Sequence, residues 1–314
     1  MSREYRRGKP GDPSWGSRRA AQRRQGSMHS MHSRRMRKPA PREERMPEAN
    51  RTEPEVRKMP GDIVLQGTAA AVVSACNEES TMDQVLGELE KLPLKDIIVV
   101  LNGCTDGTHS IVAQHHPGAT LVNLPDRLGH DVGRAVGARM TRADIVLFVD
   151  GDLPIPAFEL LPFLQAVDQG TDVALNDLGR HLPPFAQQDS VTRCKAFLNR
   201  ILRRPDLGAS SLTAVPHALS RRLLDQLGPA MLAVPPKAHA MAVLYGMKVA
   251  AVHTVDVIKT NRKRTFNTGK GNGMEQLIVG DHAEALTAVF QVAGVSLSGP
   301  VPTRVDVAKG RNAR

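Results

Sequence analysis

The sequence predicts an α/β protein in which a mostly parallel central sheet is flanked by helices. Between about residue 68 and residue 176, apolar runs of strand length alternate with segments of helical period. This alternation is typical of successive β-α-β units. The run Ile145 to Val149 has five branched or aromatic residues, which is typical of a strand buried on both faces. Asp150-Gly151-Asp152 follows it directly.

The individual elements are expected in two groups, one on each side of Asn176. In the first group, strands are expected at residues 69–75, 96–101, 120–123, 144–149 and 172–175, with helices after Thr81, around 111–113, over 129–140 and after Pro156. Thr81 and Gln84 predict a capping box at the first helix. In the second group, we expect a polar stretch at 177–190, a basic amphipathic helix over 191–204, a loop over 207–216, a helix over 220–227, a strand over 249–257 and a helix over 275–292.

The basic character of the chain comes from its first 60 residues. The formal net charge is +10; residues 1–60 hold 17 Lys and Arg against 7 Asp and Glu, whereas residues 61–314 hold 25 of each. The segment 1–60 has almost no periodic apolar positions, so we expect a disordered basic tail. One interpretation is a solvated extension, and the other is a weak tether to an anionic surface. The neutral body gives no reason to expect specific nucleic-acid binding.

Other features of the sequence indicate where the protein is found. No run of about 18 apolar residues is present, so a transmembrane segment is not expected. No apolar segment follows the early arginines, so a secretory signal is not expected either. The three cysteines, Cys76, Cys104 and Cys194, are widely spaced and match neither a disulfide framework nor a zinc site. We therefore expect a cytoplasmic protein, peripheral at the membrane if the tail binds lipid.

The pair Asp150 and Asp152 is the strongest indication of chemistry. Both carboxylates lie where a buried strand leaves the sheet, at the edge where open α/β folds bind ligands. Mg²⁺ and Mn²⁺ prefer hard oxygen ligands and commonly join one or two carboxylates to substrate phosphates. Asp-Gly is also a common turn, so this DxD motif alone is a weak signal. Together with the predicted sheet, it indicates a metal–phosphate site.

Four segments in register resemble family 2-type glycosyltransferases of the GT-A fold. They are V-V-S-A-C-N-E-E (72–79), I-V-V-L-N-G-C-T-D-G-T (98–108), G-R-A-V-G (133–137) and V-L-F-V-D-G-D (146–152). The resemblance is close over residues 68–180 and loose to about 265. It implies a GT-A domain over 61–265, with a nucleotide-binding half at 61–176 and an acceptor half at 177–265. A C-terminal helix and a loose tail would occupy 266–314.

The resemblance also implies an activity and a set of site residues. A sugar would move from a nucleoside-diphosphate sugar to an acceptor that the sequence does not identify, with Mg²⁺ or Mn²⁺ as cofactor. The implied contacts are Ala75, Cys76, Asn77 and Glu78 with the nucleoside, Asn102 with the base, Arg134 with the diphosphate, Asp150 with the ribose and the metal, and Asp152 as principal metal ligand. Three alternatives remain: Glu78 as a solvated first-turn carboxylate, Arg134 as a surface salt bridge, and Asn102-Gly103 as a simple turn.

The sequence departs from the family pattern at several points. Leu101-Asn102 replaces two acidic residues, Cys76 replaces a base-stacking aromatic residue, and Ala135 replaces an asparagine, so the nucleobase stays open. No Glu-Asp pair occurs in 177–265 to serve as the base of an inverting enzyme, and retaining enzymes need none. His239 is a candidate general base or metal ligand, and a packed or surface histidine is the alternative. His253 is a candidate third metal ligand, with a solvent-facing side chain as the alternative.

The layout further resembles glucosyl-3-phosphoglycerate synthase-like enzymes, in which a metal-binding histidine follows the last strand. Here residues 258–264 are basic and contain no histidine. This cluster would hold an anionic substrate or be a solvated charged run. Two other functions are weighed. One is a catalytically inactive nucleotide-binding protein; the other is a nucleotidyltransferase, which needs a Gly-rich segment where this chain has Ala75 to Glu78.

Overall fold

The computed structural model describes residues 64–257 and 272–294. The expected basic tail, the basic cluster at 258–264 and the end of the chain lie outside these residues. Every described residue belongs to one compact unit of the chain.

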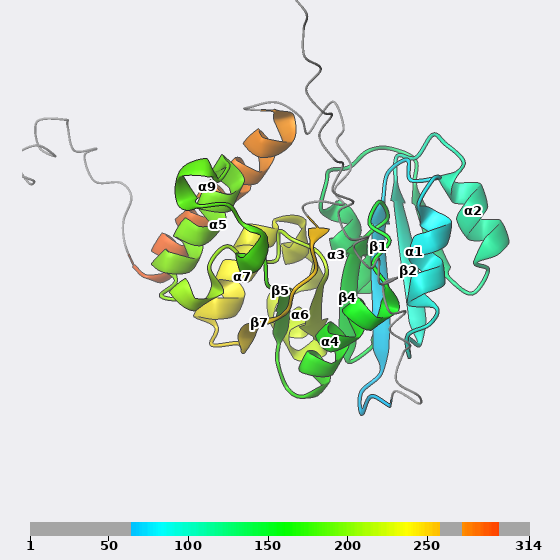
Figure 1. Cartoon of the computed structure of the whole chain (residues 1–314), viewed down its shortest axis with the longest axis horizontal. Helices are drawn as coiled ribbons and strands as arrows, with labels where there is room; N and C mark the ends of the chain where they lie inside the picture. The colour runs from blue at the N-terminus through cyan, green and yellow to red at the C-terminus, as the bar shows by residue number, and fades with distance from the viewer. Residues whose placement is uncertain (1–63, 258–271, 295–314) are drawn as a thin grey trace, which may run out of the picture. The chain divides into compact units, whose positions relative to one another are not determined.

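This unit is built on a seven-stranded sheet with the order β3-β2-β1-β4-β6-β5-β7 (Figure 1). The strands are β1 (Ala69–Ala75), β2 (Asp96–Asn102), β3 (Thr120–Leu124), β4 (Ile145–Asp150), β5 (Val173–Asn176), β6 (His217–Ser220) and β7 (Val249–His253). The first four pair in parallel, as do β5 and β7. Only β6 runs antiparallel to its neighbours β4 and β5. The predicted mostly parallel α/β sheet is confirmed.

Helices cover both faces of this sheet. They are α1 (Met82–Leu89), α2 (Thr108–His115), α3 (Val132–Met140), α4 (Ala157–Asp168), α5 (Ser190–Ile201), α6 (Arg221–Leu227), α7 (Pro235–Leu244) and α9 (Gly273–Val292). Short 3₁₀ turns lie at η1 (Gly179–His181), η2 (Phe185–Gln187), η3 (Pro205–Leu207) and η4 (Pro229–Ala233). None of the described helices is long and apolar enough to cross a membrane.

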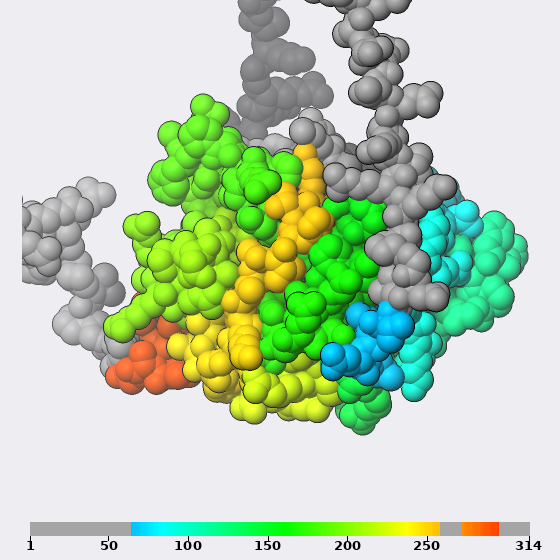
Figure 2. Space-filling model, turned by 60° about the horizontal axis from the view of Figure 1, so that its bottom comes forward, coloured from blue at the N-terminus to red at the C-terminus, as the bar shows by residue number. Residues whose placement is uncertain are grey.

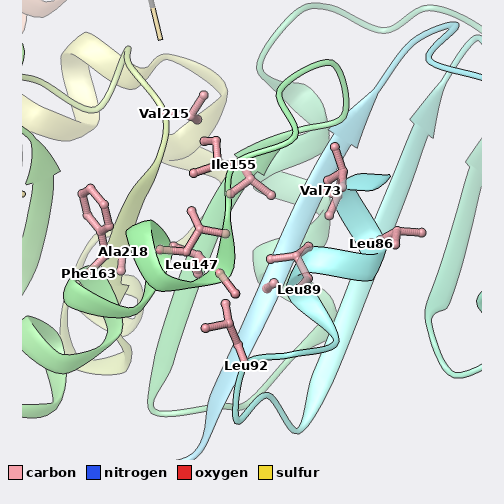
Figure 3. Packing of buried hydrophobic residues seen from close by; sticks show 14 of the residues in the cluster. Val73, Leu86, Leu89, Leu92, Leu147, Ile155, Phe163, Val215 and Ala218 are labelled. Carbon is pink, nitrogen blue, oxygen red and sulfur yellow. The ribbon is translucent and has the colours of Figure 1, made fainter. Parts of the chain in front are cut away.

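Two hydrophobic clusters form because successive strand residues point to opposite faces. Val73 and Leu147 face α1 and α4, where they pack with Leu86, Leu89 and Phe163 (Figure 3). Val72 and Phe148, one residue away on the same strands, belong to the cluster that includes residues of α3, α6 and α7. The sheet is therefore buried on both sides, as the apolar runs predict.

A third cluster joins α5, α7 and α9 at the end of the unit away from α2 (Figure 1). Leu198, Ala240 and Val289 are among its buried members.

The predicted C-terminal helix is confirmed, and the side chain of Asn272 caps it by accepting a hydrogen bond from the backbone N–H of Glu275 at 2.9 Å. Figure 2 shows the yellow-to-orange stretch around β7 running beside the green surface that includes α4.

Several expectations about single elements are wrong. Neither β6 (His217–Ser220) nor α7 was expected, and Ser220, the expected first residue of a helix, is the last residue of β6. The last strand ends at His253 rather than 257, and α3 begins at Val132 rather than 129. The capping box is also wrong, because the Thr81 hydroxyl makes no cap hydrogen bond and donates instead to the carbonyl of Gly151 at 2.8 Å.

Candidate active site

The turn that carries the two aspartates is held firmly against β1 and α1. Asp150 ends β4 opposite Ser74 of β1. The backbone N–H of Gly151 donates to the Ser74 carbonyl at 2.9 Å, and the Gly151 carbonyl accepts from Thr81. A Cβ at position 151 would lie 2.8 Å from Met82 Cε and 2.9 Å from Ala75 Cβ, so no side chain fits there. Glycine is therefore required between the two carboxylates.

Arg134 is buried beside this turn. Its guanidinium lies 3.0 Å from the carboxylate of Asp131 and 3.4 Å from that of Asp150, and it donates to the Leu212 carbonyl at 3.2 Å. Burial lowers the pKa of Arg134, but the negative charges of Asp131 and Asp150 outweigh burial and raise that pKa above its ordinary value. The surface salt-bridge alternative is wrong, since only 4% of the residue is exposed.

Two glycines let α3 bring Arg134 this close to the sheet. A Cβ on Gly133 would lie 2.7 Å from Ser74 Oγ, and one on Gly137 would lie 2.3 Å from Val72 Cγ1.

Sequence reasoning missed Asp131, which precedes α3 and pairs with Arg134 three residues later. The Asp-x-x-Arg spacing at the start of a helix was the available signal.

The loops after β1 and β2 are joined at the expected nucleoside side of the site. Asn77 adopts a left-handed conformation with φ of 62°, and its side-chain oxygen accepts from the backbone N–H of Thr105 at 2.8 Å. The backbone N–H of Glu78 donates to the Thr108 hydroxyl at 2.8 Å. Glu78 is 3% exposed, so the solvated-carboxylate alternative is wrong. Ala75 is also buried, and Cys76 is half-buried and forms no disulfide.

Asn102 lies at the end of β2 and is buried. Its side-chain oxygen accepts from the backbone N–H of Leu128 at 2.9 Å, and its amide nitrogen donates to the Gly129 carbonyl at 2.5 Å. Both ends of the amide thus hold the segment that leads into α3. The contact of Asn102 with a nucleobase stays a prediction, and the observed role is to position this segment.

His239 lies in the core rather than at a surface. It is fully buried in α7, where its Nε2 donates to Asn199 Oδ1 at 2.7 Å. Nε2 is the donor because the Asn199 amide nitrogen already donates to the carbonyls of Gly208 and Ser210, so Oδ1 faces the histidine as an acceptor. Burial, reinforced by His282 and Arg204, lowers the pKa of His239 to about 3. A neutral histidine without exposed surface has no access to an acceptor, so the packed alternative describes its observed state.

His253 is held by a different part of the protein. Its Nε2 pairs closely with Glu159 of α4, and its ring meets Phe163 edge-on with centroids 6.0 Å apart. Within residues 64–257 and 272–294, no three His, Cys, Asp or Glu side chains are grouped so as to hold a metal ion. The structure therefore does not bring His253 together with Asp150 and Asp152.

The remaining pair, Asp150 and Asp152, has the donor chemistry that a divalent cation requires. Both are carboxylates on one rigid turn at the carboxyl edge of the parallel strands, and the side chain of Asp150 is 25% exposed. Two hard oxygen ligands suffice where substrate phosphates complete the coordination. The pair thus fits Mg²⁺ or Mn²⁺ without a third protein ligand.

The sheet order, the single antiparallel strand β6 and the acidic turn after β4 define a transferase domain of the GT-A type. The model of the family "Glycosyl transferase family 2" matches residues 70–227, which is half of the chain, and the protein belongs to this family. It is therefore a glycosyltransferase. The nucleotidyltransferase alternative is accordingly not supported.

Similar solved structures include glucosyl-3-phosphoglycerate synthase from Mycobacterium tuberculosis. Its complex with Mn²⁺, uridine diphosphate and glucosyl-3-phosphoglycerate matches with a TM-score of 0.50 and 20% identity, covering 74% of this chain and 82% of that chain. Its complex with uridine diphosphate matches with a TM-score of 0.51 and 21% identity, covering 74% and 83%. At this identity the likeness shows the fold. No curated protein matches the sequence.

Proposed function

We propose that this glycosyltransferase takes its sugar from a nucleoside-diphosphate sugar and requires a divalent cation held by Asp150 and Asp152. The observation that carries the proposal is the Asp150-Gly151-Asp152 turn, fixed between β1 and α1 at the carboxyl edge of the sheet. Ligands of open α/β sheets bind at this edge. The similar synthase was crystallised with Mn²⁺ and UDP-glucose.

The negative charge around the Asp150-Gly151-Asp152 turn explains why a cation is needed. The carboxylates of Asp131 and Asp150 already surround Arg134, and Asp152 lies two residues after Asp150 on the same turn. A diphosphate is itself anionic, so one guanidinium does not offset these groups. When bound, Mg²⁺ or Mn²⁺ would supply the missing positive charge and stabilise the leaving diphosphate as a Lewis acid.

The chain's own residues have separate tasks in this proposal. Ala75, Cys76 and Asn77, at the end of β1, line the nucleoside side. Arg134 orients the carboxylate of Asp150 and offers its charge to the diphosphate, a group that guanidinium binds well. The buried position of Arg134 and its two carboxylate partners keep it charged throughout. Neither the sugar nor the acceptor is specified by these residues.

The test is a calorimetric titration of UDP and GDP, each with and without Mn²⁺, on the wild type and Asp152→Asn. We expect the wild type to bind one nucleotide only with Mn²⁺, and we expect Asp152→Asn to lose this dependence together with on the order of 100-fold of donor turnover. Asp225→Asn, which alters an exposed carboxylate on α6, is the matched control. Metal-dependent nucleotide binding that survives in Asp152→Asn would overturn the proposed metal site.

A further inference from the structure

A second set of polar groups lies next to Arg134, on the loop between η3 and β6. Asn199 of α5 donates to the carbonyls of Gly208 at 2.9 Å and Ser210 at 3.0 Å. Arg134 of α3 donates to the carbonyl of Leu212 at 3.2 Å. Two helices therefore fix the backbone of this loop through its carbonyl groups, and the Ser210 hydroxyl accepts a hydrogen bond from the backbone N–H of Leu178 at 3.3 Å.

Two hydroxyl groups on this loop lack partners in the part of the chain that the structure describes. The Oγ of Ser211 is buried without a hydrogen bond, and so is the Oγ1 of Thr213. An unsatisfied buried hydroxyl destabilises the folded protein, and such groups in native proteins usually meet a ligand or a water molecule. These residues flank Leu212, so both hydroxyls belong to the stretch that Arg134 holds.

Lys195 brings a positive charge to the same side of the loop. It lies one turn before Asn199 on α5, the residue that holds the carbonyls of Gly208 and Ser210, and its charge interacts with that of Arg134. The side chain of Lys195 lies on the face of α5 opposite to the exposed Phe197. It makes no hydrogen bond or ion pair with any described residue. Burial lowers the pKa of Lys195 to about 8, the charge of Arg134 lowers it further, and Asp189 and Asp131 act in the opposite direction. An ammonium group in such surroundings is stabilised by an anionic ligand.

We propose that Lys195, Ser211 and Thr213 form a subsite that binds an oxyanion, a phosphate or carboxylate group of a substrate, beside Arg134. The ammonium supplies charge and the two hydroxyls supply donors, whereas Arg134 is already engaged by Asp131 and Asp150. This inference rests on the proposed function, because it adds an anion site beside Arg134, the residue proposed to meet the diphosphate. The oxyanion comes either from the donor's diphosphate or from the acceptor.

The test is a calorimetric titration with inorganic phosphate, in the presence and absence of saturating UDP and Mn²⁺. We expect Lys195→Gln to weaken phosphate binding at least tenfold, Lys195→Arg to retain most of it, and Lys91→Gln, an exposed lysine on another part of the surface, to leave it unchanged. If UDP binding weakens in parallel in Lys195→Gln, the oxyanion is the donor's; if UDP binding is unchanged, it is the acceptor's.

Ser211→Ala and Thr213→Val separate binding from folding. Each removes a hydroxyl that has no partner in the described chain, so we expect the melting temperature without phosphate to stay equal or rise while phosphate binding falls several-fold. Phosphate affinity should also fall as the pH rises through about 8, where Lys195 loses its proton. The charged and titratable groups around it are Asp189 at the start of α5, Asp131 and Arg134 of the α3 region, and His282 of α9.

The outcomes of this experiment distinguish the two proposals. Absence of phosphate binding in the wild type, or equal phosphate binding in the wild type and Lys195→Gln, would overturn the oxyanion subsite. Absence of metal-dependent UDP binding in the wild type would instead overturn the proposed function. The phosphate titration without UDP does not depend on that result.

Discussion

The guanidinium of Arg134 lies 3.4 Å from Oδ1 of Asp150, so α3 and the end of β4 are joined by an ion pair within the protein itself. The same guanidinium binds Asp131, the residue just before α3, at 3.0 Å. One oxygen of the first aspartate is thereby oriented by the protein. The orientation of the proposed metal site thus depends on Arg134, which both holds α3 against β4 and offsets the charge of two carboxylates.

Replacing Arg134 by methionine should destabilise the protein strongly. The substitution leaves the buried carboxylate of Asp131 without its cation, and breaking a buried ion pair in this way costs about 3–5 kcal/mol. Chemical denaturation measures this loss, and Arg134→Lys should give a smaller one. Arg139→Met, an exposed arginine on the same helix, is the control. Equal stability of Arg134→Met and Arg139→Met would contradict the assigned role.

Gly151→Ala tests the close packing of the acidic turn. The new methyl group would meet Met82 and Ala75 at less than 3 Å, and overpacking of this kind typically costs about 1–3 kcal/mol. We also expect donor turnover to fall, because the turn must shift and move both carboxylates. Gly87→Ala in α1, where nothing lies within 4 Å of the added Cβ, should instead stabilise the protein by about 0.5–1 kcal/mol. A stable, fully active Gly151→Ala would show that the turn yields easily.

The sequence was sufficient to predict the half of the fold that contains β1 to β4. These strands are continuous apolar runs, and their helices have one apolar face. By contrast, β6 is only four residues long, and its strand conformation depends on pairing with both β4 and β5. Helix α7 is buried on nearly every side, so it has no polar face and no period of 3.6 to reveal it.

The candidate site was predictable to a similar degree. Asp150, Asp152 and Arg134 belong to motifs with fixed spacing, and the structure brings Arg134 to Asp150. The burial and the hydrogen-bond partners of Asn102 and His239 were not predictable, because they depend on residues distant in sequence. Asn102 is held by the backbone of Leu128 and Gly129, and His239 by Asn199, 40 residues away. Lys195 was missed because its electrostatic interactions with Arg134 and Asp131 arise only in the folded chain.

Two buried histidines predict how stability depends on pH. Burial is the main reason why the pKa values of His217 and His239 fall to about 3, with Arg134 adding to the effect at His217. In the unfolded chain each histidine has its ordinary value of about 6.5. Below that pH the unfolded state binds protons that the folded state does not, so stability is lost as the pH falls from about 6.5 towards 3.

The variant His239→Gln isolates one of these two contributions. Each histidine contributes up to about 1.4 kcal/mol per pH unit in this window, so removing one should flatten the decline of unfolding free energy. The glutamine amide can still donate to Asn199. His109→Gln, an exposed position on α2, should keep the wild-type slope. Identical slopes in wild type and His239→Gln between pH 6.5 and about 4.5 would contradict the buried neutral state.

The pair of His253 and Glu159 predicts which role His253 has. The histidine is paired with Glu159 and packed on Phe163, and it is not grouped with the two aspartates. We therefore expect His253→Gln to leave the Mn²⁺ concentration needed for UDP binding unchanged. Unfolding of His253→Gln, Glu159→Gln and the double variant should show a coupling on the order of 1 kcal/mol between the two residues. A several-fold rise in the Mn²⁺ requirement in His253→Gln, but not in Glu159→Gln, would instead identify His253 as a metal ligand.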